Sequence, residues 1–173
     1  MWSSIELYIE NISYIAAEPL KSRTFGDGVG ELPLGVPDDL FRAARSVLNN
    51  AYAPYSGYKV ASAVRAESGN IYTGTNVENA SYGLSMCAER VAVFNAVSRG
   101  ERKIKEVLVL FESGEPAPPC GACLQVISEF GDDDTVIHSV SLSGGERTWR
   151  LSELLPTRFN KEYLSRKKGP EPA

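Results

Sequence analysis

The run NVENASYGLSMCAER over residues 76–90 and the run PCGAC over residues 119–123 decide how this chain is organised. Together they hold all three cysteines of the 173-residue chain, Cys87, Cys120 and Cys123. Thiolates are preferred zinc ligands, and three protein ligands leave one tetrahedral position for a water molecule, as in catalytic rather than structural zinc sites. The two runs therefore predict a zinc centre with hydrolytic chemistry.

Apolar spacing places both runs at the starts of helices. From about Met86, the positions of Val91 and Phe94 predict a helix that ends at Gly100. A second helix is expected over residues 120–130, with two of the cysteines in or beside its first turn. Two helix N-termini would then face the same ion, and their dipoles and free amide groups would stabilise its thiolates.

Glu89 is the candidate acid and base, but it lies two positions after Cys87. Residues so spaced do not share a helix face. The pairing works only at a helix end, where Cys87 can bind the ion while the Glu89 carboxylate reaches its water and moves protons. Arg90 and Gln125 could donate hydrogen bonds to the sulfurs, although each alone is better explained as a solvated polar residue.

A structural zinc or a redox pair is the usual interpretation of an isolated Cys-x-x-Cys. A structural zinc would need a fourth protein ligand, and the chain has no further cysteine. Its only histidine, His138, falls in a predicted strand and is interpreted as an ordinary strand residue. The combination of the two runs therefore favours the catalytic site.

The order of the other elements is helix, hairpin, helix, strand, helix, strand. The first helix begins at Asp38 and Asp39. Strands are expected over residues 59–66, 71–75, 104–111 and 135–142, with a short strand at 147–151 and a helical turn at 152–155. This order predicts an α/β fold with a mixed sheet covered by helices.

The ends of the chain differ in composition from its centre. Residues 1–36 are expected to form an extension made of a short amphipathic helix and a linker rich in glycine and proline. We expect the catalytic domain over residues 37–164 and a disordered tail over residues 165–173. The first 17 residues lack the basic leading region of an export signal.

Composition and charge limit the classes of partner and the compartment that we expect for this chain. The net charge of −4 provides no basic field for nucleic acid. No run of eighteen apolar residues exists, so we expect no membrane span. An odd number of cysteines cannot pair fully, and their clustering fits metal-bound thiolates in the reducing cytoplasm.

Residues 76–90 closely resemble the central motif of nucleoside cytidine deaminases, and residues 119–123 with Gln125 match the second motif of that family. The run AYAPYS at 51–56 and the run LLP at 154–156, followed by Phe159, also look like family segments. The resemblance implies a cytidine-deaminase-like fold of α/β/α layers with a mixed five-stranded sheet. It also implies a homotetramer with its sites at subunit interfaces.

The reaction that the resemblance implies is hydrolytic deamination of cytidine and deoxycytidine to uridine and deoxyuridine, with release of ammonia, a step of pyrimidine salvage. Hydroxide on Zn²⁺ would attack C4 of the base while Glu89 protonates N3. Asn76 and Glu78 match the family residues that hold the ribose hydroxyl. A carboxylate there fits a free 3′-hydroxyl and would repel a phosphate, which favours nucleosides. From the residues alone, both would be interpreted as loop hydrogen-bonding groups.

Other positions match the family less closely. Tyr58 stands where the family usually has a phenylalanine beside the base, and its hydroxyl needs a partner. The resemblance also places Ala88 among the substrate contacts and Phe159 in a neighbouring subunit's base pocket, although Phe159 is nearly as well explained as a core residue. Leu124 replaces a usual arginine, which removes a polar contact but no ligand.

Three alternatives stay open at this point. The run VASA at residues 60–63 looks like that of blasticidin S deaminase, so a modified cytosine nucleoside is a possible substrate. A deaminase of polynucleotides is disfavoured by the acidic balance and by Glu78. The third alternative is not an enzyme: it is a non-catalytic zinc-binding module whose N-terminal extension docks a partner.

Overall fold

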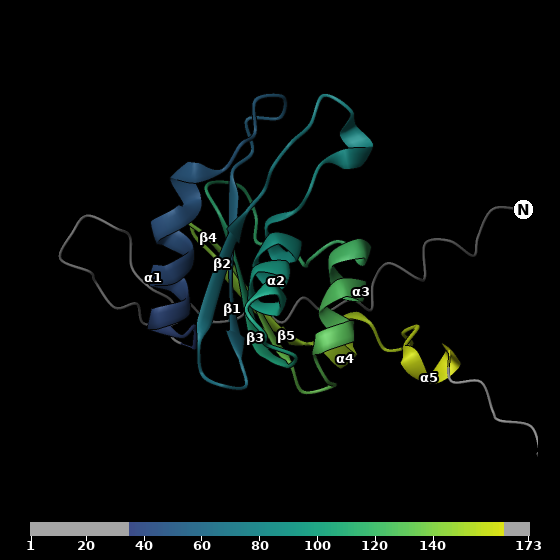
Figure 1. Cartoon of the computed structure of the whole chain (residues 1–173). Coiled ribbons are helices and arrows are strands. Elements are labelled where there is room, and N and C mark those ends of the chain that lie inside the picture. Colours follow the sequence, from purple (N-terminus) through teal and green to yellow (C-terminus); the bar gives the residue numbers. More distant parts are fainter. Residues whose placement is uncertain (1–34, 165–173) are drawn as a thin grey trace, which may run out of the picture. The chain divides into compact units, whose positions relative to one another are not determined.

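The computed structural model describes residues 35–164, and these residues build one mixed sheet with helices on both faces (Figure 1). The strands lie in the order β2-β1-β3-β4-β5, and only β3 and β4 are parallel neighbours. Their bounds are β1 Val60–Ala66, β2 Ile71–Thr75, β3 Ile104–Phe111, β4 Val136–Ser141 and β5 Glu146–Arg150. The predicted α/β class with a mixed five-stranded sheet is confirmed.

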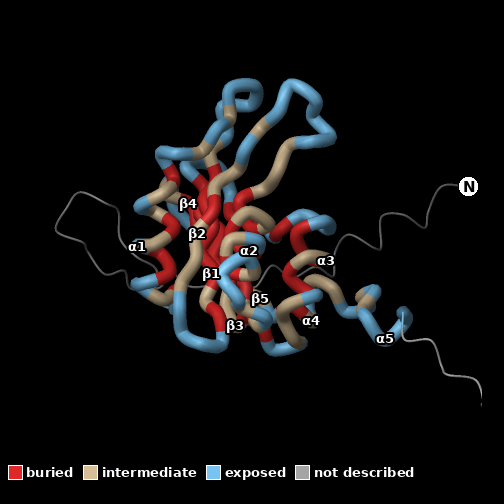
Figure 2. The backbone as a smooth tube through the Cα atoms, viewed as in Figure 1, coloured by how far each residue is buried: buried red, intermediate tan, exposed pale blue. Residues whose placement is uncertain are grey.

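Three main helices cover the sheet. Figure 1 shows α1 (Asp38–Val47) on one face and α2 (Ala88–Ser98) with α3 (Gly121–Phe130) on the other. The helix α1 buries Leu40, Phe41 and Ala44, whose spacing matches the period of a helix. On the other face, buried residues of α2 and α3 join those of the central strands in one core, which Figure 2 shows between the layers.

A glycine sets how closely α2 lies to the sheet. A Cβ atom at Gly74 of β2 would lie 2.4 Å from the backbone nitrogen of Ala92 and 2.7 Å from the carbonyl oxygen of Ala88. Cβ atoms do not approach backbone atoms so closely, so any side chain at this position would push α2 outward. Gly74 therefore fixes the position of the first turns of α2.

Two loops extend from the same end of the sheet, where β1 begins and β2 ends. The backbone amide of Tyr52 donates to the carbonyl of Asn76 (3.0 Å), and the amide of Glu78 donates back to the carbonyl of Tyr52 (2.8 Å). These bonds hold the loop at residues 51–59 beside the loop at residues 76–87. Figure 2 shows that both loops are largely exposed.

The observed elements agree with the predicted ones to within about two residues at each end. The expected last strand and helical turn are β5 and α4 (Leu151–Leu154). Short turns of helix at Leu48–Asn50, at Tyr82–Leu84 and in α5 (Lys161–Leu164) were not expected. The predicted N-terminal helix and the tail at 165–173 lie outside the described residues. Within residues 35–164, no helix has the length and apolar character needed to cross a membrane.

Candidate active site

The three cysteines meet at one point between two helices. Their Sγ atoms all lie within 4.8 Å of one another, although Cys87 is more than thirty residues away from the other two along the chain. The Sγ of Cys87 lies 3.9 Å from that of Cys120, and the Sγ of Cys120 lies 3.6 Å from that of Cys123. All three are free thiols.

These distances fit a tetrahedral zinc ion. Zinc–sulfur bonds of about 2.3 Å place two tetrahedral sulfur ligands about 3.8 Å apart, close to the two measured separations. Within residues 35–164, no fourth His, Cys, Asp or Glu donor belongs to this group. His138 lies in β4, where its Nδ1 is 3.0 Å from the hydroxyl of Thr148. The donor set therefore suits an ion with an open position.

Two helix N-termini face the sulfurs, as the sequence predicts. Cys87 is the N-cap residue of α2 and Cys120 is the N-cap residue of α3, and neither makes a side-chain capping bond. Cys123 follows in the first turn of α3 and is completely buried. The amide groups and dipoles of both helices are thus available to stabilise negative charge on the thiolates.

The thiols also share hydrogen bonds that separate their acidities. The bond with Cys123 and the guanidinium of Arg90 lower the pKa of Cys87 to about 5. The same pairing with Cys87, together with burial, raises the pKa of Cys123 well above its usual value. Of these two thiols, Cys87 therefore ionises before Cys123.

Glu89 lies in the first turn of α2 with only 6% of its surface exposed. Burial raises the pKa of this carboxyl to about 7. A carboxyl group with that pKa can accept and return a proton near neutral pH. The position at the helix end is the one that lets a residue two places after Cys87 reach the same site.

Arg90 and Gln125 are the two residues that could donate to the sulfurs, and the structure brings only Arg90 to one of them. Nη2 of Arg90 lies 3.6 Å from the Sγ of Cys87, and this bond raises the pKa of the guanidinium. Nε2 of Gln125 instead donates to the carbonyl oxygen of Phe159 (2.8 Å). Gln125 therefore anchors the C-terminal segment to α3, and its expected bond to a sulfur is not present among the described residues.

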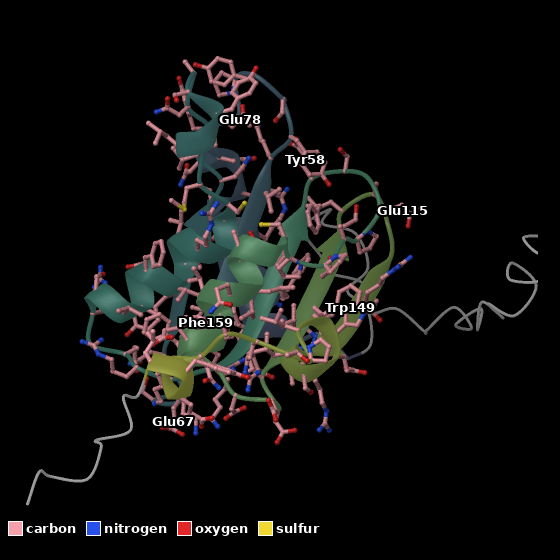
Figure 3. All side chains as sticks on the ribbon, turned by 90° about the vertical axis from the view of Figure 1, so that its right-hand side faces the viewer. Tyr58, Glu67, Glu78, Glu115, Trp149 and Phe159 are labelled. Atoms are coloured by element: carbon pink, nitrogen blue, oxygen red, sulfur yellow. The ribbon has the colours of Figure 1, made fainter. Side chains whose placement is uncertain are left out.

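Asn76 holds the loop that carries Tyr58. Its Oδ1 accepts a hydrogen bond from the amide of Val60 (2.9 Å), and its Nδ2 donates to the carbonyl of Tyr58 (2.8 Å). Tyr58 is 39% exposed, and the centre of its ring lies 5.8 Å from that of Phe111. Both residues lie at the loop end of the sheet, where Figure 3 labels Tyr58.

Glu78 also holds the loop at residues 51–59, through its carboxylate. Its Oε2 accepts from the amides of Tyr55 (2.9 Å) and Ser56 (3.2 Å), and its Oε1 accepts from the hydroxyl of Ser56. The hydroxyl of Ser56 is the main cause of a lowered pKa at Glu78, so this carboxylate is ionised at neutral pH. The sequence pattern singles out Glu78 but not Ser56, although Ser56 belongs to the family-like run AYAPYS.

Phe159 and Ala88 have opposite environments. Ala88 is completely buried at the start of α2. Phe159 is 57% exposed and stacks on Tyr163, with ring centres 5.8 Å apart. Figure 3 places Phe159 well apart from Tyr58 and Glu78, so within one chain it does not line the same site. It is not the core phenylalanine that the sequence left as an alternative.

Comparison with known proteins identifies the family. A family model described as the cytidine and deoxycytidylate deaminase zinc-binding region matches residues 36–139. A cytidine deaminase from Halalkalibacterium halodurans is 42% identical over 126 residues, which are 73% of this chain and 96% of that protein.

Solved structures of cytidine deaminases are also similar to this chain. The crystal structure of cytidine deaminase from Burkholderia pseudomallei has a TM-score of 0.68 and 40% identity, covering 72% of this chain and 99% of that one. The structure of cytidine deaminase from Mycobacterium tuberculosis has a TM-score of 0.62 and 35% identity, covering 70% and 94%. The chain therefore belongs to the cytidine deaminase family of zinc-dependent hydrolases.

Proposed function

We propose that this chain hydrolyses the C4 amino group of cytidine and deoxycytidine, giving uridine or deoxyuridine and ammonia. The observation that carries the proposal is the meeting of three thiols within 4.8 Å at two helix N-termini, with the carboxyl group of Glu89 buried beside them. The names of the relatives support cytidine as the substrate. We place this function in residues 37–164 and the protein in the cytoplasm, where thiols stay reduced.

Different residues would hold the ion and move the protons. Cys87, Cys120 and Cys123 would hold Zn²⁺, and Arg90 would withdraw charge from the sulfur of Cys87. When bound, zinc supplies the Lewis acidity that makes a water molecule nucleophilic near neutral pH.

Glu89 would carry the protons of the reaction. Its carboxylate would take a proton from the water whose oxygen bonds to C4, and deliver this proton to N3 of the base. It would then move the remaining proton of that oxygen to the amino group, so that the C4–N bond breaks, ammonia leaves and the C4 carbonyl of uridine forms. Because the side chain is buried, bulk water does not compete with the substrate for this carboxyl group. Its position at a helix end lets it act without being a ligand.

The substrate contacts would come from the exposed loops. Asn76 and Glu78 would bind the sugar hydroxyl, Tyr58 would stack on the base, and Ala88 would offer backbone groups beside it. The ionised carboxylate of Glu78 accepts a hydrogen bond from a free hydroxyl but repels a phosphate, which favours nucleosides over nucleotides.

We further propose a homotetramer whose sites lie at subunit interfaces. Large apolar side chains are exposed along the two loops and the C-terminal segment, among them Tyr52, Tyr55, Tyr82, Leu84 and Phe159. Large exposed apolar side chains, here on the loops and separately on the C-terminal segment, are features of protein interfaces. Phe159, which lies apart from its own site, would then reach the base pocket of a neighbour.

The direct test is a nucleoside panel followed by ultraviolet absorbance, with sedimentation of the same sample. We expect turnover of cytidine and deoxycytidine, no turnover of cytidine monophosphate, and a mass four times that of the 18.8 kDa chain. Turnover of a modified nucleoside such as blasticidin S with none of cytidine would overturn the substrate assignment. A protein that keeps zinc but deaminates no nucleoside would be the binding module instead.

A further inference from the structure

The hydroxyl of Ser56 has a fixed direction. Its oxygen accepts a hydrogen bond from the amide of Tyr58 (3.0 Å), and its hydrogen is donated to Oε1 of Glu78. Because the oxygen already serves as an acceptor on the Tyr58 side, the O–H bond points at the carboxylate. These two bonds connect the backbone of Tyr58, through the hydroxyl of Ser56, to the carboxylate of Glu78. Figure 3 labels Tyr58 and Glu78 at this end of the molecule.

The hydrogen bond from Ser56 helps to determine which acceptor position of Glu78 stays available. A carboxylate has about four lone-pair positions, two on each oxygen. On Oε2, the amides of Tyr55 and Ser56 occupy both. On Oε1, the hydroxyl of Ser56 occupies one. The remaining acceptor position is thus on Oε1, the oxygen that the hydroxyl of Ser56 holds.

We propose that Ser56 is a positioning residue, which orients Oε1 of Glu78 so that its last free acceptor position meets the sugar hydroxyl of the nucleoside. The inference rests on the proposed function, because it takes Glu78 as the residue that binds the sugar. Ser56 itself does not touch the reacting atoms. It acts through Glu78.

The neighbouring bonds limit the size of the effect. Without the hydroxyl of Ser56, Oε2 keeps both amide donors, while Oε1 loses its only partner among residues 35–164. Asn76 still holds the carbonyl of Tyr58, so the loop does not open. We therefore expect weaker binding of the sugar with the chemistry of the base almost unchanged.

Ser56→Ala tests this, and Ser68→Ala is its matched control. The hydroxyl of Ser68 also donates to an exposed carboxylate, that of Glu101 (2.6 Å), but in the hairpin turn at the opposite ends of β1 and β2. With Ser56→Ala, we expect KM for cytidine to rise about tenfold with kcat within about twofold, as loss of one hydrogen bond to a charged group predicts. Ser56→Thr should restore KM, and Ser68→Ala should leave it unchanged.

A substrate without the hydroxyl separates this role from a general structural one. For 2′,3′-dideoxycytidine, Ser56→Ala should change KM by less than about twofold, because there is no sugar hydroxyl at the 3′ position to bind. An equal loss for cytidine and for the dideoxy nucleoside would overturn the proposal, since it would show that the loop as a whole had changed.

Hydrogen exchange gives a result that does not depend on turnover. In the free protein, Ser56→Ala should speed exchange of the Tyr58 amide, which loses its acceptor, while Ser68→Ala should not. Unchanged exchange with unchanged KM would overturn the proposal. If the wild-type chain deaminates no cytidine, the proposed function fails on its own, and the exchange rates still decide whether Ser56 makes these bonds.

Discussion

The cluster of three cysteines and the two loops that we propose bind the substrate are built in opposite ways. The cluster stands at the N-termini of α2 and α3, where Glu89 is 6% exposed and Cys123 is buried. The loops are exposed, and side-chain bonds from Asn76 and Glu78 to the backbone hold them. In the function proposed above, the chemistry would thus take place at helix ends, and the substrate would be recognised by a surface whose shape depends on hydrogen bonds.

This difference predicts how each region fails. A change at the cluster should abolish a function, because ligands and proton carrier act as one unit. A change in the loops should weaken substrate binding only partly, because several hydrogen bonds each contribute to it. The following variants test that contrast.

The largest effect is expected for Cys120→Ser. Because Cys120 is exposed, its loss should leave the fold intact while removing one of three zinc ligands. We expect zinc to be lost and turnover to fall to background, measured by metal analysis and ammonia release, with an unchanged circular dichroism spectrum. Normal zinc content together with normal turnover would show that the sulfurs do not form the site.

Glu89→Gln should keep the ion and lose the chemistry. The amide is isosteric with the carboxyl group but cannot carry a proton, so kcat should fall at least about 100-fold. Zinc content should equal that of the unchanged chain. Full turnover by this variant would remove Glu89 from the mechanism.

Substituting one glycine in each region compares how much the stability of the fold depends on close packing there. Gly74→Ala places a methyl group against the backbone of α2, whereas Gly83 in the loop has no atom within 4 Å of the added carbon and no positive φ. We expect Gly74→Ala to lower the melting temperature by several degrees, as a loss of about 1–3 kcal/mol would do. Gly83→Ala should leave the melting temperature within about one degree. Equal melting temperatures would mean that α2 does not need the close approach.

The smallest effect on catalysis is expected for Glu78→Gln. The neutral amide keeps an acceptor oxygen but loses the charge, so KM for cytidine should rise about tenfold with kcat little changed. The same variant should reduce discrimination against cytidine monophosphate, because a neutral group does not repel phosphate. A large fall in kcat with unchanged KM would place Glu78 in the chemistry rather than in sugar binding.

The sequence predicts the cluster better than the loops for a physical reason. Helix periodicity and the spacing of cysteines are local patterns, and they are sufficient to place Cys87, Cys120 and Glu89 at helix ends. The bounds of the strands also follow largely from local patterns. The bond between Ser56 and Glu78 joins residues 22 positions apart, and no local pattern specifies it.

Gln125 shows the same limit. Its place in the first turns of α3, near two cysteines, allows a bond to sulfur, although Gln125 taken alone is better explained as a solvated polar residue. The amide instead donates to the carbonyl of Phe159, 34 positions away. Which of two partners a polar side chain takes depends on what the distant chain brings to it. The sequence does not predict the four-residue helix α5, because so short an element has no apolar period to detect.

The most direct test of the account measures zinc and ammonia release from cytidine in the same preparation while a chelator removes the metal in steps. A site made by three thiols should hold a single zinc ion per chain, and turnover should fall in proportion to the zinc removed and return when zinc is restored. Ammonia release that persists after all zinc has gone, or a fully loaded protein that releases none, would contradict it.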